Sequence, residues 1–100
     1  MSDILISLVD DQQLFRSGLA SLIRSVPGFT LLSEAENGKV FLDDLENSGI
    51  LPHIALIDME MPVMNGVELN AALQKTYPSV KVIVLSTYNQ ERFIGKMIEA

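Results

Sequence analysis

Near its N-terminus the sequence reads Ile4-Leu5-Ile6-Ser7-Leu8-Val9-Asp10-Asp11, a short apolar run that ends in two aspartates. A run of this length, rich in branched side chains and closed by polar residues, is typical of a buried β-strand. Three more apolar segments of similar length follow at similar intervals, and they cover residues 29–33, 54–57 and 80–85. We expect a strand at each of the four.

The segments between these strands have the spacing of helices. The clearest places apolar residues at steps of three and four from Leu14 to Val26 and ends before Pro27. Shorter helices are expected around residues 40–45 and 67–73, and a fourth begins near Gln90. Strands that alternate with helices predict an α/β fold with a doubly wound parallel sheet. If the strand order is 2-1-3-4, the first and third strands are neighbours.

Length and composition limit the classes of protein that this chain can represent. One hundred residues with 48% hydrophobic content are enough for one core and one domain. The apolar runs are too short to span a bilayer, and no basic region precedes the first, so we expect a cytoplasmic protein without a membrane partner. The absence of cysteine excludes disulfides and thiolate metal sites.

The charge balance favours a bound cation over a bound polyanion. Thirteen acidic residues against seven basic ones give a net charge of −6. A broad electrostatic attraction to nucleic acid is therefore not expected of this segment.

Ligands of open parallel sheets bind at the carboxyl ends of the strands, which directs attention to the residues there. Asp10 and Asp11 follow the first strand, Asp58 follows the third, and Ser86 follows the fourth. A single aspartate at such a position can be a helix N-cap or a loop acid. Three ionised carboxylates about 5 Å apart repel one another by about 3 kcal/mol per pair at an effective dielectric constant of 20, and Mg²⁺ relieves that repulsion.

Other kinds of site are not supported by the sequence. The glycines form neither a dinucleotide-binding nor a phosphate-binding loop motif, and Ser86 has no histidine nearby to activate it. His53 precedes the third strand, so it is expected at the opposite end of the sheet from the aspartates. The methionines at positions 59, 61 and 64 are expected to pack in a loop.

These residues together resemble the receiver domain of bacterial two-component response regulators. The resemblance covers Ile4 to Ala100 and rests on the Asp10-Asp11 pair, Asp58, Met61-Pro62, Asn65-Gly66 and Ser86. It implies a flavodoxin-like sheet. Residues 9–19 are similar in particular to the subfamily that carries a C-terminal helix-turn-helix (LuxR-type) output domain, which is not part of these 100 residues.

The resemblance also implies roles for individual residues. Asp58 would be the phosphoacceptor for a sensor histidine kinase or a small phosphodonor. Asp11, Asp58 and the backbone carbonyl of Glu60 would bind Mg²⁺, and Asp10 would act through a water molecule. Ser86 would bond a phosphoryl oxygen and report phosphorylation. The chain would then be a signalling module that controls an output, most simply transcription, and not an enzyme.

Receivers of this family continue into a fifth strand, which carries a lysine, and a fifth helix. We therefore expect residues 1–100 to be one receiver domain that is incomplete at its C-terminus, and to self-associate through the fourth strand or by exchange of elements. Two alternatives stay open. One is a phosphorylation-incompetent dimerisation or docking module, and the other is an aspartyl-phosphate hydrolase suggested by Asp58-x-Glu60.

Overall fold

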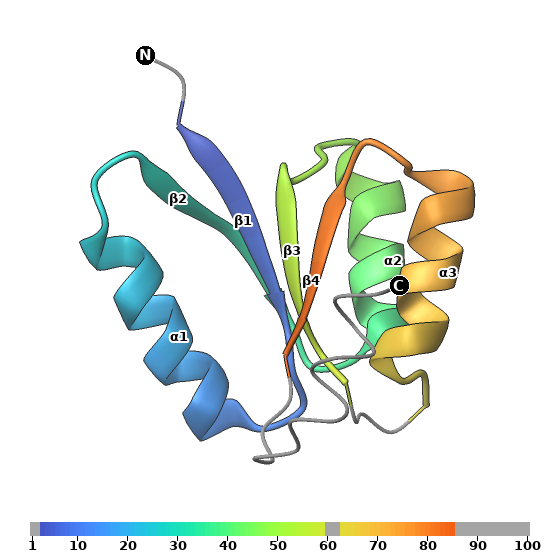
Figure 1. The fold of residues 1–100 in the computed structure, drawn as a ribbon, viewed down its shortest axis with the longest axis horizontal. Coiled ribbons are helices and arrows are strands. Elements are labelled where there is room, and N and C mark those ends of the chain that lie inside the picture. Colours follow the sequence, from blue (N-terminus) through green and yellow to red (C-terminus); the bar gives the residue numbers. More distant parts are fainter. Residues whose placement is uncertain (1–2, 60–62, 86–100) are drawn as a thin grey trace.

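The computed structural model describes residues 3–59 and 63–85 (Figure 1). The expectations for Glu60, Met61, Ser86 and the helix near Gln90 lie outside the described residues. The described elements are β1 (Ile4–Val9), α1 (Gln13–Ser25), β2 (Phe29–Ala35), α2 (Gly38–Ser48), β3 (Ile54–Asp58), α3 (Gly66–Thr76) and β4 (Lys81–Leu85).

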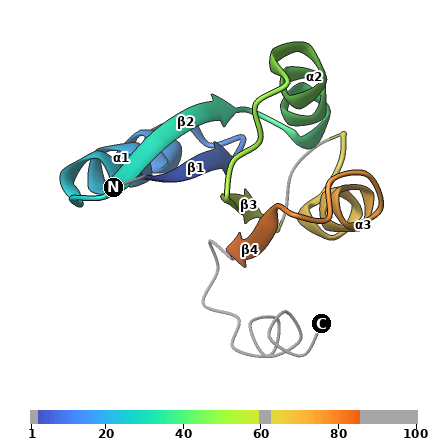
Figure 2. The ribbon, with the colours of Figure 1, turned by 90° about the horizontal axis from the view of Figure 1, so that it is seen from above.

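The four strands form one parallel sheet in the order β2-β1-β3-β4, so the predicted doubly wound topology is confirmed. Helix α1 covers one face of the sheet, and α2 and α3 cover the other (Figures 1 and 2). Because β1 and β3 are neighbours in register, with Val9 opposite Ile57, their carboxyl ends lie level with each other. In the described residues, no helix is long and apolar enough to cross a membrane.

Several element boundaries differ from those expected. β2 continues past Ser33 to Ala35, because Ala35 still pairs with Val9 of β1. Helix α2 begins at Gly38, two residues before the expected start of its apolar spacing at residue 40. The side chain of Asn37 caps that helix by accepting a hydrogen bond of 2.9 Å from the Val40 N–H.

The core has two parts, one on each face of the sheet. The larger part lies under α2 and α3, and its buried residues are Val9, Ala35, Phe41, Leu45, Ala55, Ile57, Leu69, Leu73 and Val80. The smaller part lies under α1 and contains Ile6, Leu8, Ala20 and Ile23. Helix α1 buries only part of its apolar face against the sheet. Leu14 is 89% exposed and Leu22 is 64% exposed.

A β-bulge interrupts the pairing of β1 with β2. Ile6 lies opposite Leu31 but Ser7 lies opposite Ser33, so Leu32 is the additional residue. The bulge turns Ser33 to the same face as Ser7, which is fully buried, and the two hydroxyl oxygens share a hydrogen bond of 2.8 Å. A polar group inside the sheet is thereby satisfied.

Candidate metal and phosphoacceptor site

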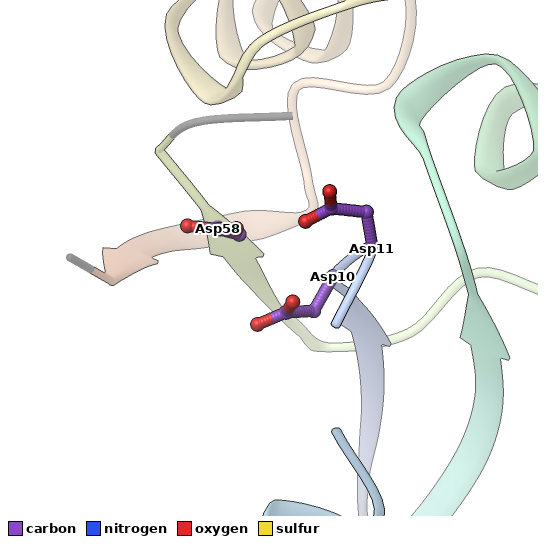
Figure 3. Close-up of side chains that lie close together, drawn as sticks. All are labelled: Asp10, Asp11 and Asp58. Atoms are coloured by element: carbon purple, nitrogen blue, oxygen red, sulfur yellow. The ribbon is translucent and has the colours of Figure 1, made fainter. Parts of the chain in front are cut away.

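Three aspartates meet at the carboxyl ends of β1 and β3 (Figure 3). Asp10 and Asp11 follow β1, and Asp58 is the last residue of β3. One carboxylate oxygen from each of the three lies within 4.8 Å of the others. The structure therefore brings together the three carboxylates that the sequence placed after neighbouring strands, in the oxygen-only arrangement that suits a hard divalent cation.

The three carboxylates have different surroundings. Asp10 and Asp58 are 3% and 2% exposed, whereas Asp11 is exposed to solvent. Burial raises the pKa of the Asp10 carboxyl above its ordinary value, and the negative charge of Asp11 adds to the rise. A hydrogen bond from the Gln12 N–H to Asp10 Oδ1, 2.8 Å long, and the charge of Arg16 oppose it. A cation bound here would favour the ionised form.

Helix capping does not account for these aspartates. The N-cap of α1 is Gln12, and the N-cap of α3 is Asn65. Asn65 Oδ1 accepts the Glu68 N–H at 2.8 Å, and Glu68 Oε1 accepts the Asn65 N–H at 3.0 Å, which completes a capping box. The N-cap interpretation is therefore wrong for Asp10, Asp11 and Asp58.

The segment after Asp58 is tied to the sheet through the backbone of Met59. Its N–H donates to the Leu85 carbonyl oxygen at 2.9 Å, and its carbonyl oxygen accepts the Gly66 N–H at 3.0 Å. These two bonds join the end of β3 to the end of β4 and to the start of α3. They hold the backbone around Asp58 in a fixed position relative to the sheet.

Arg16 is a residue of this site that the sequence interpretation missed. Its Nη1 donates to the carbonyl oxygen of Asp10 at 2.5 Å, and its Nε donates to Glu34 Oε1 at 3.2 Å. Its side chain is only 16% exposed. The available signal was an arginine in the first turn of the helix that follows the acidic pair.

Two further residues named from the sequence, His53 and Met64, make structural contacts. His53 precedes β3 at the opposite end of the sheet, as expected, and its Nδ1 accepts the Leu5 N–H at 2.8 Å. Met64 packs against Gly38 and the larger part of the core, as expected for a loop methionine.

A cavity of about 450 Å³ lies between β2 and α2, away from the acidic cluster. It is lined by Leu32, Ser33, Asp44, Leu45, Asn47, Ser48 and Ile50. None of the three converging aspartates lines it, so the candidate site is a group of side chains at the sheet edge and not this cavity.

Fold and site define a receiver-type module, and comparison with known proteins agrees. The family model for the response regulator receiver domain matches residues 6–100. The chain belongs to this family.

The relatives combine a matching segment with further sequence of their own. The chain is 34% identical over 96 residues to the transcriptional regulatory protein DegU of Brevibacillus brevis, covering 96% of this chain and 40% of that protein. It is 34% identical to a protein-glutamate methylesterase/protein-glutamine glutaminase of Treponema denticola, covering 91% of this chain and 24% of that protein. The chain thus spans less than half the length of either relative.

Among solved structures, a LuxR-family DNA-binding response regulator from Staphylococcus aureus superposes with a TM-score of 0.79 at 26% identity. The match covers 96% of this chain and 78% of that one. A receiver is mainly a signalling module, and relatives of this one include transcription regulators.

Proposed function

We propose that this receiver accepts a phosphoryl group on Asp58 from a sensor histidine kinase and that its acidic cluster holds Mg²⁺ during the transfer. The convergence of three carboxylates within 4.8 Å at the ends of β1 and β3 carries this proposal. Two of them are buried, and holding like charges together in a poorly solvated place is unfavourable unless a cation is shared.

Asp58 is the carboxylate assigned to the reaction. One of its oxygens attacks phosphorus, the bond from phosphorus to the donor's imidazole nitrogen breaks, and the nitrogen leaves with its electron pair. Asp11, Asp58 and the carbonyl of Glu60 would hold the ion, Asp10 would act through a water molecule, and Ser86 would bond a phosphoryl oxygen; the roles of Glu60 and Ser86 rest on the family resemblance. When bound, Mg²⁺ supplies positive charge that offsets the phosphoryl oxygens.

The kinase must reach the carboxyl edge of the sheet, and α1 offers the apolar surface beside it. Leu14 and Phe15 lie in the first turn of α1, and they are 89% and 37% exposed. Exposed apolar side chains next to a reactive group favour a protein partner at that place.

We infer a transcriptional output for the whole protein because DegU is a transcriptional regulatory protein. The net charge of −6 supports indirect control, without contact between this segment and nucleic acid. We assign no substrate turnover to this segment, because the acidic site is equipped to carry a phosphoryl group on the protein itself.

Phosphorylation is tested by intact mass spectrometry after incubation with Mg²⁺ and acetyl phosphate. We expect the parent chain to gain one phosphoryl mass and the Asp58→Asn variant to gain none. Asp44→Asn, which changes an exposed aspartate of α2, is the matched control and is expected to be modified like the parent. An unmodified parent, or a modified Asp58→Asn variant, contradicts the assignment.

We also infer that copies of this chain associate through β4. In the described part of the chain β4 is an outer strand of the sheet, and its Ile83 is 47% exposed. Sedimentation velocity at micromolar concentration is expected to show a dimer that Ile83→Lys dissociates. Val67→Lys, a matched change at a 54% exposed valine of α3, is expected to leave it intact. A monomeric parent contradicts the inference.

A further inference from the structure

The guanidinium of Arg16 reaches back from α1 to the backbone that carries the acidic pair. Nη1 donates to the Asp10 carbonyl oxygen at 2.5 Å while Nε donates to Glu34 Oε1 at 3.2 Å. Different nitrogens of one planar group make the two bonds, so the direction of one bond constrains the direction of the other. With only 16% of the side chain exposed, few other orientations are open to it.

These contacts complete the restraints on Asp10. Its N–H donates to the Ala35 carbonyl oxygen at 3.0 Å, and its Oδ1 accepts the Gln12 N–H at 2.8 Å. Its carbonyl oxygen is the acceptor for Arg16. That carbonyl belongs to the planar peptide unit that leads to Asp11, so a bond to it fixes the direction in which the chain enters Asp11.

Asp11 benefits most from such a restraint, because it is exposed and follows the end of β1, whereas Asp10 and Asp58 are packed into the protein. The distance between the carboxylates of Asp11 and Asp58 depends on the orientation of the peptide unit before Asp11. Arg16 is the side chain that holds this unit, and Glu34 on β2 holds Arg16 in turn.

The positive charge of Arg16 and its hydrogen bonds predict opposite effects on the binding of Mg²⁺. A guanidinium close to a cation site repels the cation, so simple electrostatics says that removing Arg16 strengthens Mg²⁺ binding. If Arg16 positions the Asp10–Asp11 peptide, removing Arg16 weakens the binding of Mg²⁺, because the three carboxylates are no longer held in the arrangement that binds one ion. Because the two effects have opposite signs, the change in Mg²⁺ affinity when Arg16 is replaced distinguishes between them.

We propose that Arg16 is a positioning residue of the Mg²⁺ site, which holds the Asp10–Asp11 peptide in the orientation that lets the three carboxylates share one ion, with Glu34 as its support. This inference rests on the proposed function, since it assumes that the acidic cluster binds Mg²⁺. In this role Arg16 holds the carboxylates in place before Mg²⁺ binds.

The test is isothermal titration of Mg²⁺ into the parent chain and four variants. Arg16→Met removes the charge and the hydrogen bonds, and Arg16→Lys keeps the charge but not the two-branched group. Glu34→Gln weakens the support. Arg24→Met is the matched control, because Arg24 lies on the same helix and within 3.8 Å of the same Glu34 carboxylate but is 63% exposed.

We expect the Mg²⁺ dissociation constant to rise about tenfold or more in both Arg16 variants, in the range seen when supporting hydrogen bonds of metal ligands are removed. Glu34→Gln is expected to produce a smaller rise in the same direction. Arg24→Met is expected to stay within about twofold of the parent, as for other exposed charges. Tighter binding in Arg16→Met with parent-like binding in Arg16→Lys shows a charge effect and overturns the proposal.

Thermal unfolding in EDTA separates positioning from general stability. A lower melting temperature in Arg16→Met with an unchanged Mg²⁺ dissociation constant means that Arg16 is only structural, and overturns the proposal. If the parent binds Mg²⁺ and is phosphorylated while the Arg16 variants bind the ion equally well, only the positioning role fails. A parent that neither binds Mg²⁺ nor accepts a phosphoryl group overturns the proposed function and this inference together.

Discussion

Gly66 lies so close to Asp58 that a Cβ atom added to Gly66 would be 2.6 Å from the carbonyl oxygen of Asp58. The same atom would be 2.9 Å from the Cα of Met59. Both contacts are with backbone, which cannot rotate away as a side chain can. The first residue of α3 therefore has to be glycine for α3 to start against the end of β3.

Gly66→Ala is expected to lower the free energy of unfolding by about 1–3 kcal/mol, the usual cost of inserting a methyl group into a filled space. It is also expected to slow phosphorylation at Asp58, because the backbone that carries this carboxylate must shift. Urea unfolding and the rate of modification by acetyl phosphate measure the two effects.

Gly18→Ala is the matched control for this prediction. Gly18 lies within α1, and a Cβ atom there would meet nothing within 4 Å. Alanine favours a helix interior over glycine by about 1 kcal/mol, so this variant should be more stable than the parent. Equal destabilisation by both changes would show that the contact with Asp58 is not the cause.

The acidic cluster makes stability depend on pH. Burial raises the pKa of Asp10 above its ordinary value of 3.8, so the folded chain keeps this proton at pH values where the unfolded chain has lost it. The free energy of unfolding in EDTA is therefore expected to fall as pH rises from 3.8 through the folded-state pKa, and to stay lower above it. Urea unfolding between about pH 4 and pH 8 measures this.

Asp10→Asn is expected to flatten that dependence and to be more stable than the parent at neutral pH without metal, because it removes a buried charge. Asp44→Asn changes an exposed acid and is expected to leave the curve as in the parent. A parent and an Asp10→Asn variant with parallel curves would show that the Asp10 carboxyl does not cause the dependence.

The four strands and the places of Asp10, Asp11 and Asp58 at strand ends were predictable from local patterns, and the meeting of the three followed on the condition that the strand order is 2-1-3-4. Short apolar runs mark strands, and the carboxyl ends of adjacent parallel strands always lie at one edge. No side-chain detail is needed for either inference. The sequence therefore predicts the group of three carboxylates once β1 and β3 are taken as neighbours.

The role of Arg16 and the bulge at Leu32 were not predictable in this way. Glu34 is 18 residues from Arg16 in the sequence, and the two meet only because α1 packs over β2. The bulge depends on the pairing of β1 with β2, which an apolar run does not specify. Likewise, apolar spacing predicted the helix α1 but not that Leu14 and Leu22 would remain exposed.

Val63 has a backbone φ of 73°, in the left-handed region that β-branched residues avoid. The Val63 side chain is 76% exposed, so removing this side chain costs the protein little packing energy. Val63→Gly is expected to raise the free energy of unfolding by about 0.5–1 kcal/mol, since relief of strain exceeds the added flexibility of the unfolded chain. Val67→Gly, at an exposed valine in α3, should instead lose about 0.3–0.5 kcal/mol, the difference between the helix propensities of valine and glycine. Urea unfolding of both variants decides whether Val63 is strained.

Ser7 and Ser33 share a side-chain hydrogen bond between β1 and β2, and the two residues are not equivalent. Ser7 is fully buried, whereas Ser33 is partly exposed to water. Ser33→Ala leaves the Ser7 hydroxyl buried without its partner and is expected to cost about 1–3 kcal/mol. Ser7→Ala should cost about 1 kcal/mol, because water can reach Ser33.

The double variant tests whether the hydrogen bond is the cause. Once both hydroxyls are gone, no buried polar group is left unsatisfied, so the combined loss should be clearly smaller than the sum of the two single losses. Urea unfolding of the parent, both single variants and the double variant gives this coupling. Losses that simply add would mean that the two hydroxyls contribute independently and that their hydrogen bond is not the cause.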